Sequence, residues 1–526
     1  MSRSFTGCKR CKARRQKCDE QRPACNRCTA ASVPCRYAMQ LQWGGRAFSR
    51  SRFGACMDNG SMQRLEYSPG EFIYTTEPSS PATTAGGSPT QSQALSRPID
   101  PFSNLSTDQK SLLHHFLRDA SQITACHPGM RHEICQMLVP RALQTPSLLY
   151  ATLALSAIHL QALRSHHQSE NVKSAPHIAR LVAWSLEHFR SELQTTSRDK
   201  GSSDVLLATA RTLCLAEIHS GAIHPNSWRA HIEGARALMV ATESSAEGEG
   251  EGEGKFRQYL DRWHRSIVSL TALTGNGPPI GEADGLGALI TAEVDDTPDY
   301  LDDYWGFTVR LAAVFRGIGW VAWRARHRGS STTHKVGAGD VDHEISQCAS
   351  HDTKQHPETT TDTTTLYDEV NTLESTLHHL IYQTITHPPT FYPGVAPRLT
   401  PTCTHHLTLC NTAFQHGALI QLHRRLHRTP SSSPTVQSSV QRILACTAEI
   451  GPAPGLSPWV LLTTPLFIAG CEARGEDRER VRSLLRQLYE TIRVPNVVQA
   501  LRFLEMYWAG RVGEEEGWNE FLGMSF

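Results

Sequence analysis

Six cysteines near the start of the chain share a spacing that occurs twice. They are Cys8, Cys11, Cys18, Cys25, Cys28 and Cys35, so that C-x2-C-x6-C is repeated 17 residues further along. Two Zn²⁺ ions with four ligands each need eight ligand positions, and six thiolates supply eight only if two of them bridge both ions. The spacing therefore predicts a binuclear zinc cluster.

The elements that must hold these thiolates follow from the same spacing. A C-x2-C pair can reach one metal ion from the first turn of a helix, where unpaired N–H groups and the helix dipole favour thiolates. The duplicated spacing then predicts two helix-plus-strand halves related by a pseudo-two-fold axis. Three disulfides are the alternative, but they need an oxidising compartment, and residues 1–7 lack the apolar segment of a secretory signal. With all four positions on each ion filled, the zinc is structural rather than catalytic.

The two halves differ in charge. Lys12, Arg14, Arg15 and Lys17 lie between Cys11 and Cys18, whereas residues 29–34 of the second half carry no charged side chain. A short helix with exposed Arg or Lys side chains can enter the major groove of DNA, where these donors fit the two acceptors of guanine. The first half is therefore predicted to contact DNA, and the same basic run is compatible with nuclear import.

Residues 8–28 resemble the fungal Zn2Cys6 binuclear cluster transcription factors, with Pro23 in the loop that connects the halves. The resemblance implies that Cys8 and Cys25 are the bridging thiolates, that Cys11 and Cys18 complete one metal site, and that Cys28 and Cys35 complete the other. It also implies that Arg14 and Arg15 read a CGG triplet. Lys12 and Lys17 would supply phosphate or flanking contacts.

Charge divides the chain in the same place. Residues 1–53 hold 13 Lys and Arg against Asp19 and Glu20, a balance of +11, whereas the whole chain carries only +1. A basic segment on an acidic body is expected to bind nucleic acid with a steep salt dependence.

Composition predicts three parts: a Zn2Cys6 DNA-binding domain with a basic extension at residues 1–53, a disordered linker at 54–104, and an all-helical domain at 105–526. No run of apolar a and d positions occurs between Tyr37 and Leu105, so a coiled coil is not predicted and the oligomeric state stays open. Disordered insertions are expected at residues 243–254, 328–365 and 429–439.

Apolar periodicity predicts helices throughout the large domain, and alternating β patterns are almost absent. The expected helical stripes are 112–117, 148–163, 178–193, 206–218, 228–240, 256–273, 304–325, 366–385, 407–426, 460–473 and 481–508. The segment 148–163 is too short and too polar to span a membrane, which favours a core helix.

Motifs of this part resemble the fungal-specific regulatory domain found in one branch of these factors. They include residues 140–149, 228–235, 304–307 and 465–473, and the likeness spans roughly residues 105–510. Residues 5–8 and 41–43 are similar to the branch that includes the arginine-metabolism regulator, a likeness that does not assign a pathway.

Other polar clusters are given structural interpretations. Five aspartates fail the spacing of a calcium loop and are expected to form a solvated acidic turn: Asp295, Asp296, Asp299, Asp302 and Asp303. His406 and Cys410 are two ligands without a visible third, and the nine cysteines outside the cluster are expected to be buried thiols in a reducing compartment. No nucleophile elbow, phosphate-binding loop or zinc-protease helix is present, so an enzyme is not predicted.

The sequence thus predicts a nuclear, sequence-specific transcription regulator of RNA polymerase II genes. Its expected partners are double-stranded DNA and the transcriptional machinery, for which the acidic and apolar residues 513–522 are one candidate contact, and no membrane is expected. The alternative is a helical ligand-sensing or protein-interaction scaffold whose zinc-binding segment serves only docking or nuclear import.

Overall fold

The structure is a computed structural model with two compact units, residues 1–55 and 56–526. It describes residues 8, 10, 11, 14, 16, 18, 19, 21, 24–35, 102, 104–165, 175–195, 200–221, 227–243, 251–275, 279–280, 298–330, 358–453 and 455–511. The predicted linker 54–104 therefore lies almost wholly outside the described residues, as does the acidic segment 513–522.

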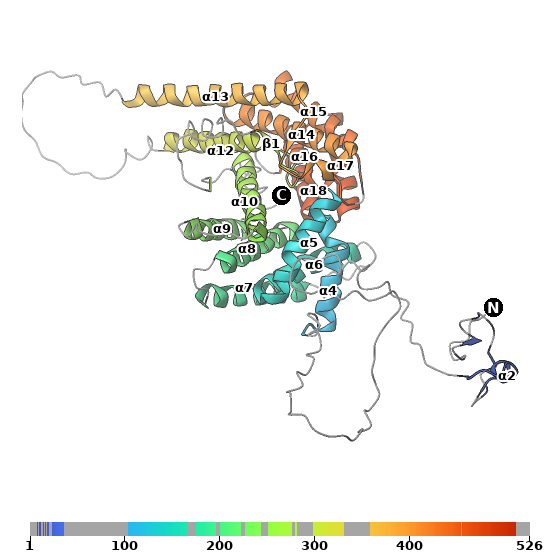
Figure 1. Ribbon diagram of the computed structural model, residues 1–526. Helices are drawn as coiled ribbons and strands as arrows, with labels where there is room; N and C mark the ends of the chain where they lie inside the picture. Colours follow the sequence, from blue (N-terminus) through green and yellow to red (C-terminus); the bar gives the residue numbers. More distant parts are fainter. Residues whose placement is uncertain are drawn as a thin grey trace, which may run out of the picture. The chain divides into compact units, whose positions relative to one another are not determined.

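Within the described residues, the larger unit is built almost entirely from helices, as the apolar periodicity predicts (Figure 1). Its first half contains α4 (Thr107–Arg118), η2 (Ala120–Gln122), α5 (Pro128–Gln144), α6 (Pro146–Ser165), α7 (Ala175–Thr195), α8 (Lys200–Ser220), α9 (Ser227–Glu243) and α10 (Glu251–Thr274). Its second half contains α12 (Val309–Ser330), α13 (Glu358–Thr386), η3 (Ala396–Arg398), α14 (Pro401–Arg425), α15 (Pro434–Ile450), η4 (Pro458–Leu461), α16 (Thr463–Glu472), α17 (Glu476–Ile492) and α18 (Pro495–Trp508).

Two hydrophobic cores lie in this unit, and α10 contributes to both. Trp263 and Phe256 of α10 pack in the first core with residues of α5, α8 and α9, whereas Leu270 and Leu273 of the same helix belong to the second. In Figure 1, α10 runs from the layer of α8 and α9 to the layer of α12. One helix thus links the two halves through its buried side chains.

Helix α6 is the most apolar long helix among the described residues. By length and composition its stretch Pro146–Arg164 could cross a membrane, but 67% of that stretch is buried. It packs against α4, α5, α7 and α8. This packing agrees with the predicted core helix.

The three predicted disordered insertions are partly wrong. Residues 429–439 are ordered, because Pro434 occupies the first turn of α15 and Val436 and Val440 are fully buried in the second core. Helices α9 and α10 extend to residues 243 and 251, so only 244–250 of the range 243–254 lies outside the described residues. Likewise α12 continues to residue 330 and α13 begins at residue 358, and 331–357 lies outside them.

Two helix boundaries also differ from the predicted stripes. The stripe 481–508 is two helices, α17 and α18, because Arg493 adopts a left-handed conformation with φ of 54° and Pro495 begins the second helix. Residues 304–308 precede α12 in a turn, next to β1 (Tyr300–Leu301). This strand pairs in parallel with β2 (Thr390–Phe391), with Tyr300 opposite Thr390.

The predicted solvated acidic turn is wrong for its described members near β1. Asp302 and Asp303 are only 5% and 2% exposed, and both contact the guanidinium of Arg262 on α10. Arg262 donates to both oxygens of Asp302 at 2.9 and 2.8 Å and to Asp303 at 2.6 Å, while His127 lies 2.9 Å from the other oxygen of Asp303. Asp299 is paired as well, because it accepts from the backbone amide of Arg310. Through Arg262 and His127, the N-cap residue of α5, Asp302 and Asp303 therefore connect α10 to the start of α5 instead of facing water.

Helices α10 and α12 approach closely at Gly319, where an added Cβ would lie 2.5 Å from the carbonyl oxygen of Ala272. We expect Gly319→Ala to destabilise the larger unit by about 1–3 kcal/mol, because the backbones would have to separate. Gly234→Ala in α9 is the matched control, since nothing lies within 4 Å of its added Cβ. The control should raise stability by about 0.5–1 kcal/mol through helix propensity. Urea unfolding of the two variants measures both effects, and equal midpoints would contradict the close approach.

Candidate zinc cluster and nucleic-acid interface

The six predicted metal ligands lie together in the amino-terminal unit. Cys8, Cys11, Cys18, Cys25 and Cys28 are buried with one another, and Cys35 is half-buried against them. Their sulfurs form two groups of four whose members lie within 4.8 Å of one another: Cys8, Cys11, Cys18 and Cys25, and Cys8, Cys25, Cys28 and Cys35. Cys8 and Cys25 are the two residues common to both groups.

The separations between the sulfurs fit zinc. A Zn–S bond of about 2.3 Å in a tetrahedron places neighbouring sulfurs about 3.8 Å apart. The sulfurs of Cys8 and Cys25 are 3.7 Å apart, those of Cys8 and Cys28 are 3.6 Å apart, and those of Cys11 and Cys25 are 3.9 Å apart. The donor set and its spacing therefore suit two tetrahedral Zn²⁺ ions.

The backbone around the sulfurs repeats as the sequence does. The amide of Cys8 donates to the sulfur of Cys18 at 3.4 Å, and the amide of Cys25 donates to the sulfur of Cys35 at 3.3 Å. In the same way Gln16 donates to the carbonyl of Cys11, and Val33, 17 residues later, donates to the carbonyl of Cys28. Corresponding residues thus make corresponding bonds in the two halves.

A helical turn carries each C-x2-C pair. In the second half Cys25 is the N-cap residue of α2 (Asn26–Thr29), and the carboxylate of Asp19 accepts from the amide of Asn26 at 2.9 Å. In the first half the amide of Arg14 donates to the carbonyl of Arg10 at 3.0 Å, the i to i+4 bond of a helix. The sulfurs therefore lie at helix starts, as the spacing predicts.

Burial opposes the ionisation of two of these thiols when no cation is near. It raises the pKa of the Cys11 thiol to about 11 and also raises the pKa of Cys25. A bound Zn²⁺ supplies the positive charge that a buried thiolate needs, and a coordinating thiol is deprotonated outright. Metal binding is thus coupled to proton release from these cysteines.

The predicted DNA-contacting residues are described only in part. Arg14 is exposed, whereas Lys12, Arg15 and Lys17 lie outside the described residues. Arg10, for which the sequence predicts no specific role, donates to the carbonyl oxygen of Arg27 at 3.0 Å and lies 4.0 Å from the sulfur of Cys28. Arg10 therefore links the two halves, a role that no local pattern indicates because its partners are 17 and 18 residues away.

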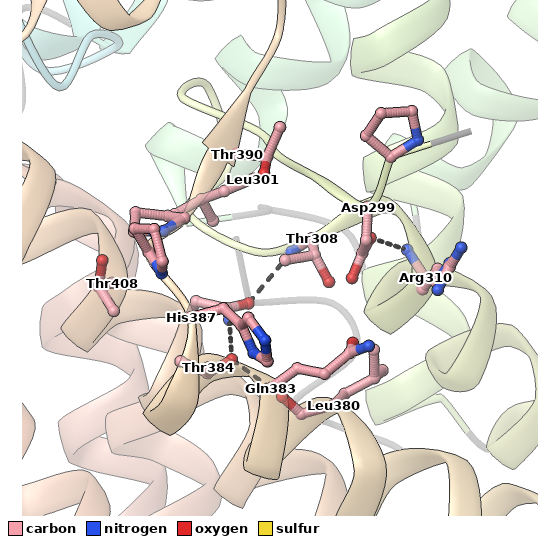
Figure 2. A pocket seen from close by; sticks show the side chains of 14 residues that line it. Asp299, Leu301, Thr308, Arg310, Leu380, Gln383, Thr384, His387, Thr390 and Thr408 are labelled. Atoms are coloured by element: carbon pink, nitrogen blue, oxygen red, sulfur yellow. Dashed lines mark hydrogen bonds between the residues drawn. The ribbon is translucent and has the colours of Figure 1, made fainter. Parts of the chain in front are cut away.

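The larger unit contains a cavity of about 370 Å³, lined by polar and apolar residues, beside β1 and the end of α13 (Figure 2). Its wall includes Asp299, Thr308, Thr384 and Asn411. Asp299 accepts from the backbone amide of Arg310 at 2.9 Å, and Asn411 accepts from the amide of Thr308 at 3.1 Å while donating to the hydroxyl of Thr384 at 3.3 Å. Each of these polar groups already has a hydrogen-bond partner within the protein, so the cavity by itself does not indicate a ligand class.

The cysteine cluster places the amino-terminal unit among small domains that are stabilised by zinc. Comparison with known proteins identifies the family of this domain. Residues 6–44 match the fungal Zn(2)-Cys(6) binuclear cluster domain, and residues 111–525 match the fungal specific transcription factor domain. The chain therefore belongs to the fungal Zn2Cys6 transcription factors, which are not enzymes. Its cluster is of the kind that binds two zinc ions.

The similar curated proteins are regulators from fungi. The chain is 31% identical over 160 residues to the Zn(2)-C6 fungal-type transcription factor afumD of Aspergillus fumigatus, covering 30% of this chain and 33% of that protein. It is 25% identical over 274 residues to the pestheic acid cluster transcriptional regulator 3 of Pestalotiopsis fici, covering 44% and 48%. It is 26% identical over 183 residues to the uncharacterized transcriptional regulatory protein C965.10 of Schizosaccharomyces pombe, covering 29% and 34%. The matched segments thus span less than half of each relative, and no solved structure matches.

Proposed function

We propose that the chain is a nuclear, sequence-specific transcription regulator of RNA polymerase II genes. In this proposal the zinc-binding unit binds double-stranded DNA and reads a CGG-like triplet in the major groove. The observation that carries it is the grouping of six cysteine sulfurs into two overlapping groups of four, in a unit that also carries an exposed arginine, Arg14. Family membership supports the same function and a nuclear location.

In this proposal the cysteines of the first unit bind zinc, and its basic residues between Cys11 and Cys18 bind DNA. Cys8 and Cys25 bridge the two ions, Cys11 and Cys18 complete one site, and Cys28 and Cys35 complete the other, an assignment supported by the two sulfur groups that share Cys8 and Cys25. Arg14 and Arg15 donate to guanine, and Lys12 and Lys17 contact phosphates or flanking bases. The zinc ions take no part in chemistry but hold the helix that carries these donors.

Charge explains why this unit rather than the larger one would approach DNA. The net charge of +11 over residues 1–53 favours release of counterions from the phosphates. Because the chain as a whole carries +1, the remaining residues are acidic on balance and are expected to be repelled by DNA. We assign residues 105–526 a regulatory role, joined to the DNA-binding unit by residues 54–104, with the transcriptional machinery as the expected partner.

A gel-shift measurement with the full chain tests this function. Replacing Arg14 and Arg15 by alanine should reduce the preference for a CGG duplex over a scrambled duplex by about 1–3 kcal/mol for each lost base contact. Arg27→Ala is the matched control, since Arg27 is an exposed arginine of the second half. Its effect should be similar on both duplexes. Equal binding of the unchanged chain to both duplexes would exclude sequence-specific recognition and favour the docking or import alternative.

A further inference from the structure

Three metal-ligating side chains converge between α13 and α14, outside the zinc cluster. His423 lies in the last turn of α14, His427 follows four residues later, and Glu374 lies on α13. The Nε2 atom of His427 is 3.1 Å from Oε2 of Glu374, and the ligand atoms of the three residues all lie within 4.8 Å of one another. Figure 1 shows α13 and α14 as neighbouring helices, and the two pack together.

The backbone fixes the two histidines one helical turn apart. The amide of His427 donates to the carbonyl of Leu422 at 3.2 Å, and the amide of Thr429 donates to the carbonyl of His423 at 2.9 Å. These bonds close the carboxyl end of α14 and hold His427 just beyond it, and the two imidazole rings lie 5.6 Å apart between centroids. Both rings therefore lie on the side of α14 that meets Glu374.

We propose that Glu374, His423 and His427 bind one divalent transition-metal ion in the larger unit. Two imidazoles and one carboxylate form a three-ligand set that suits Zn²⁺ and leaves a fourth position open. Ca²⁺ and Mg²⁺ are disfavoured because they prefer all-oxygen ligands. His378, whose Nε2 is 3.9 Å from Oε1 of Glu374, is placed to approach the fourth position.

A simple ion pair between His427 and Glu374 is the competing explanation. An ion pair needs only two groups, whereas here a second imidazole, that of His423, is held within reach of the same carboxylate. The side chains of Glu374 and His427 are 29% and 31% exposed, so an ion can enter without opening the core. A bound ion would tie α13 to the end of α14.

Titration of the full chain with Zn²⁺ tests this site. The chain is first loaded with two equivalents for the cysteine cluster, and binding of further Zn²⁺ is followed by calorimetry. We expect one further equivalent, and we expect His423→Ala and His427→Ala each to weaken it by at least about 10–100-fold, the loss found even for groups one step removed from a metal. His379→Ala is the matched control, because His379 is an exposed histidine of α13 outside the cluster, and should bind the ion unchanged.

A conservative variant separates metal binding from folding. Glu374→Gln keeps the size of the side chain and a hydrogen-bond acceptor but removes its charge. It should therefore have the same circular dichroism as the unchanged chain but bind the third Zn²⁺ ion more weakly. The unfolding temperature of the unchanged chain should also rise with added Zn²⁺ beyond two equivalents, and that of His423→Ala should not. The proposal is overturned if no further equivalent binds, or if Glu374→Gln and His423→Ala bind it as tightly as the unchanged chain.

Discussion

Removing zinc with a chelator is expected to abolish sequence-specific DNA binding by the full chain while leaving the helical content of the larger unit intact. The described part of the first unit has a core made of cysteines, with five buried and Cys35 packed against them. A module of this kind takes its folding free energy from the metal, about 10–16 kcal/mol per structural Zn²⁺ in zinc-finger peptides. We expect the affinity for the specific duplex to fall by about 10³-fold or more, to the level of nonspecific binding.

The proposal that Cys8 and Cys25 bridge the two zinc ions predicts different effects for different cysteine variants. Cys8 belongs to both groups of four sulfurs, whereas Cys18 belongs to one. Cys8→Ala should therefore release both zinc ions, and Cys18→Ala should first weaken one of them. Zinc content per chain, measured by mass spectrometry after dialysis, distinguishes the two variants.

A cysteine of the larger unit provides the control. Cys403 on α14 is half-buried and lies outside both sulfur groups. Cys403→Ala should retain two zinc ions in the cluster and unchanged DNA binding. DNA recognition that survived complete removal of zinc would show that the cluster does not hold the DNA-binding surface.

Replacing Arg262 by methionine is expected to destabilise the larger unit by about 3–5 kcal/mol, the cost of leaving buried charges without their partner. Arg262 contacts both Asp302 and Asp303, whose side chains are only 7% and 3% exposed. Its guanidinium also lies between two aromatic rings, 4.3 Å from the centroid of Tyr304 and 4.3 Å from that of Tyr392. Urea unfolding followed by circular dichroism measures the loss.

Two further variants show whether the loss comes from charge. Adding Asp302→Asn and Asp303→Asn to Arg262→Met removes the unpaired carboxylates and should recover a large part of the stability. Arg229→Ala breaks an exposed pair with Glu233, whose side chain is 53% exposed, and should cost no more than about 0.5 kcal/mol. Equal losses for Arg262→Met and Arg229→Ala would contradict a buried charge network.

The contribution of Asp303 to the pH dependence of stability should change sign when Arg262 is replaced by methionine. Burial opposes ionisation of Asp303, but the hydrogen bond from His127 and the charge of Arg262 lower its pKa below the ordinary value. A lowered pKa in the folded state means that this contribution to stability is present above about pH 4 and is lost as the pH falls through the folded value. In Arg262→Met the folded carboxyl should prefer its proton, so stability should instead fall as the pH rises above about 4.

The six cysteine ligands of the zinc cluster could be predicted from the sequence because they lie close together along the chain. Ligand spacing within 28 residues determines which sulfurs can meet, and the repeated hydrogen bonds of Gln16 and Val33 follow from that repeat. The DNA-contacting roles of Lys12, Arg14, Arg15 and Lys17 stay predictions, as does the likeness to the arginine-metabolism branch.

Some elements carried local signals that point to the observed structure. Residues 429–439 contain Pro434, a proline that suits the first turn of a helix and begins α15, and it is followed by Val436 and Val440 at helical spacing. Pro495 likewise marks the break between α17 and α18. Residues 429–439 are nevertheless predicted to be disordered, because their composition is typical of a loop. In the folded protein the burial of Val436 and Val440 stabilises the helix there.

The sequence by itself determined the binuclear cluster, the basic character of its first half and the all-helical class of the larger unit. These depend on spacing, charge and periodicity within a short stretch of chain, 28 residues for the cluster and a few helical turns for each helix. Only the tertiary structure decided that Asp302 and Asp303 are buried against Arg262, 40 and 41 residues away, and that Glu374 meets His423 and His427. Such pairs depend on how α10, α13 and α14 pack, and packing of helices distant in sequence leaves no periodic pattern in the residues that it brings together.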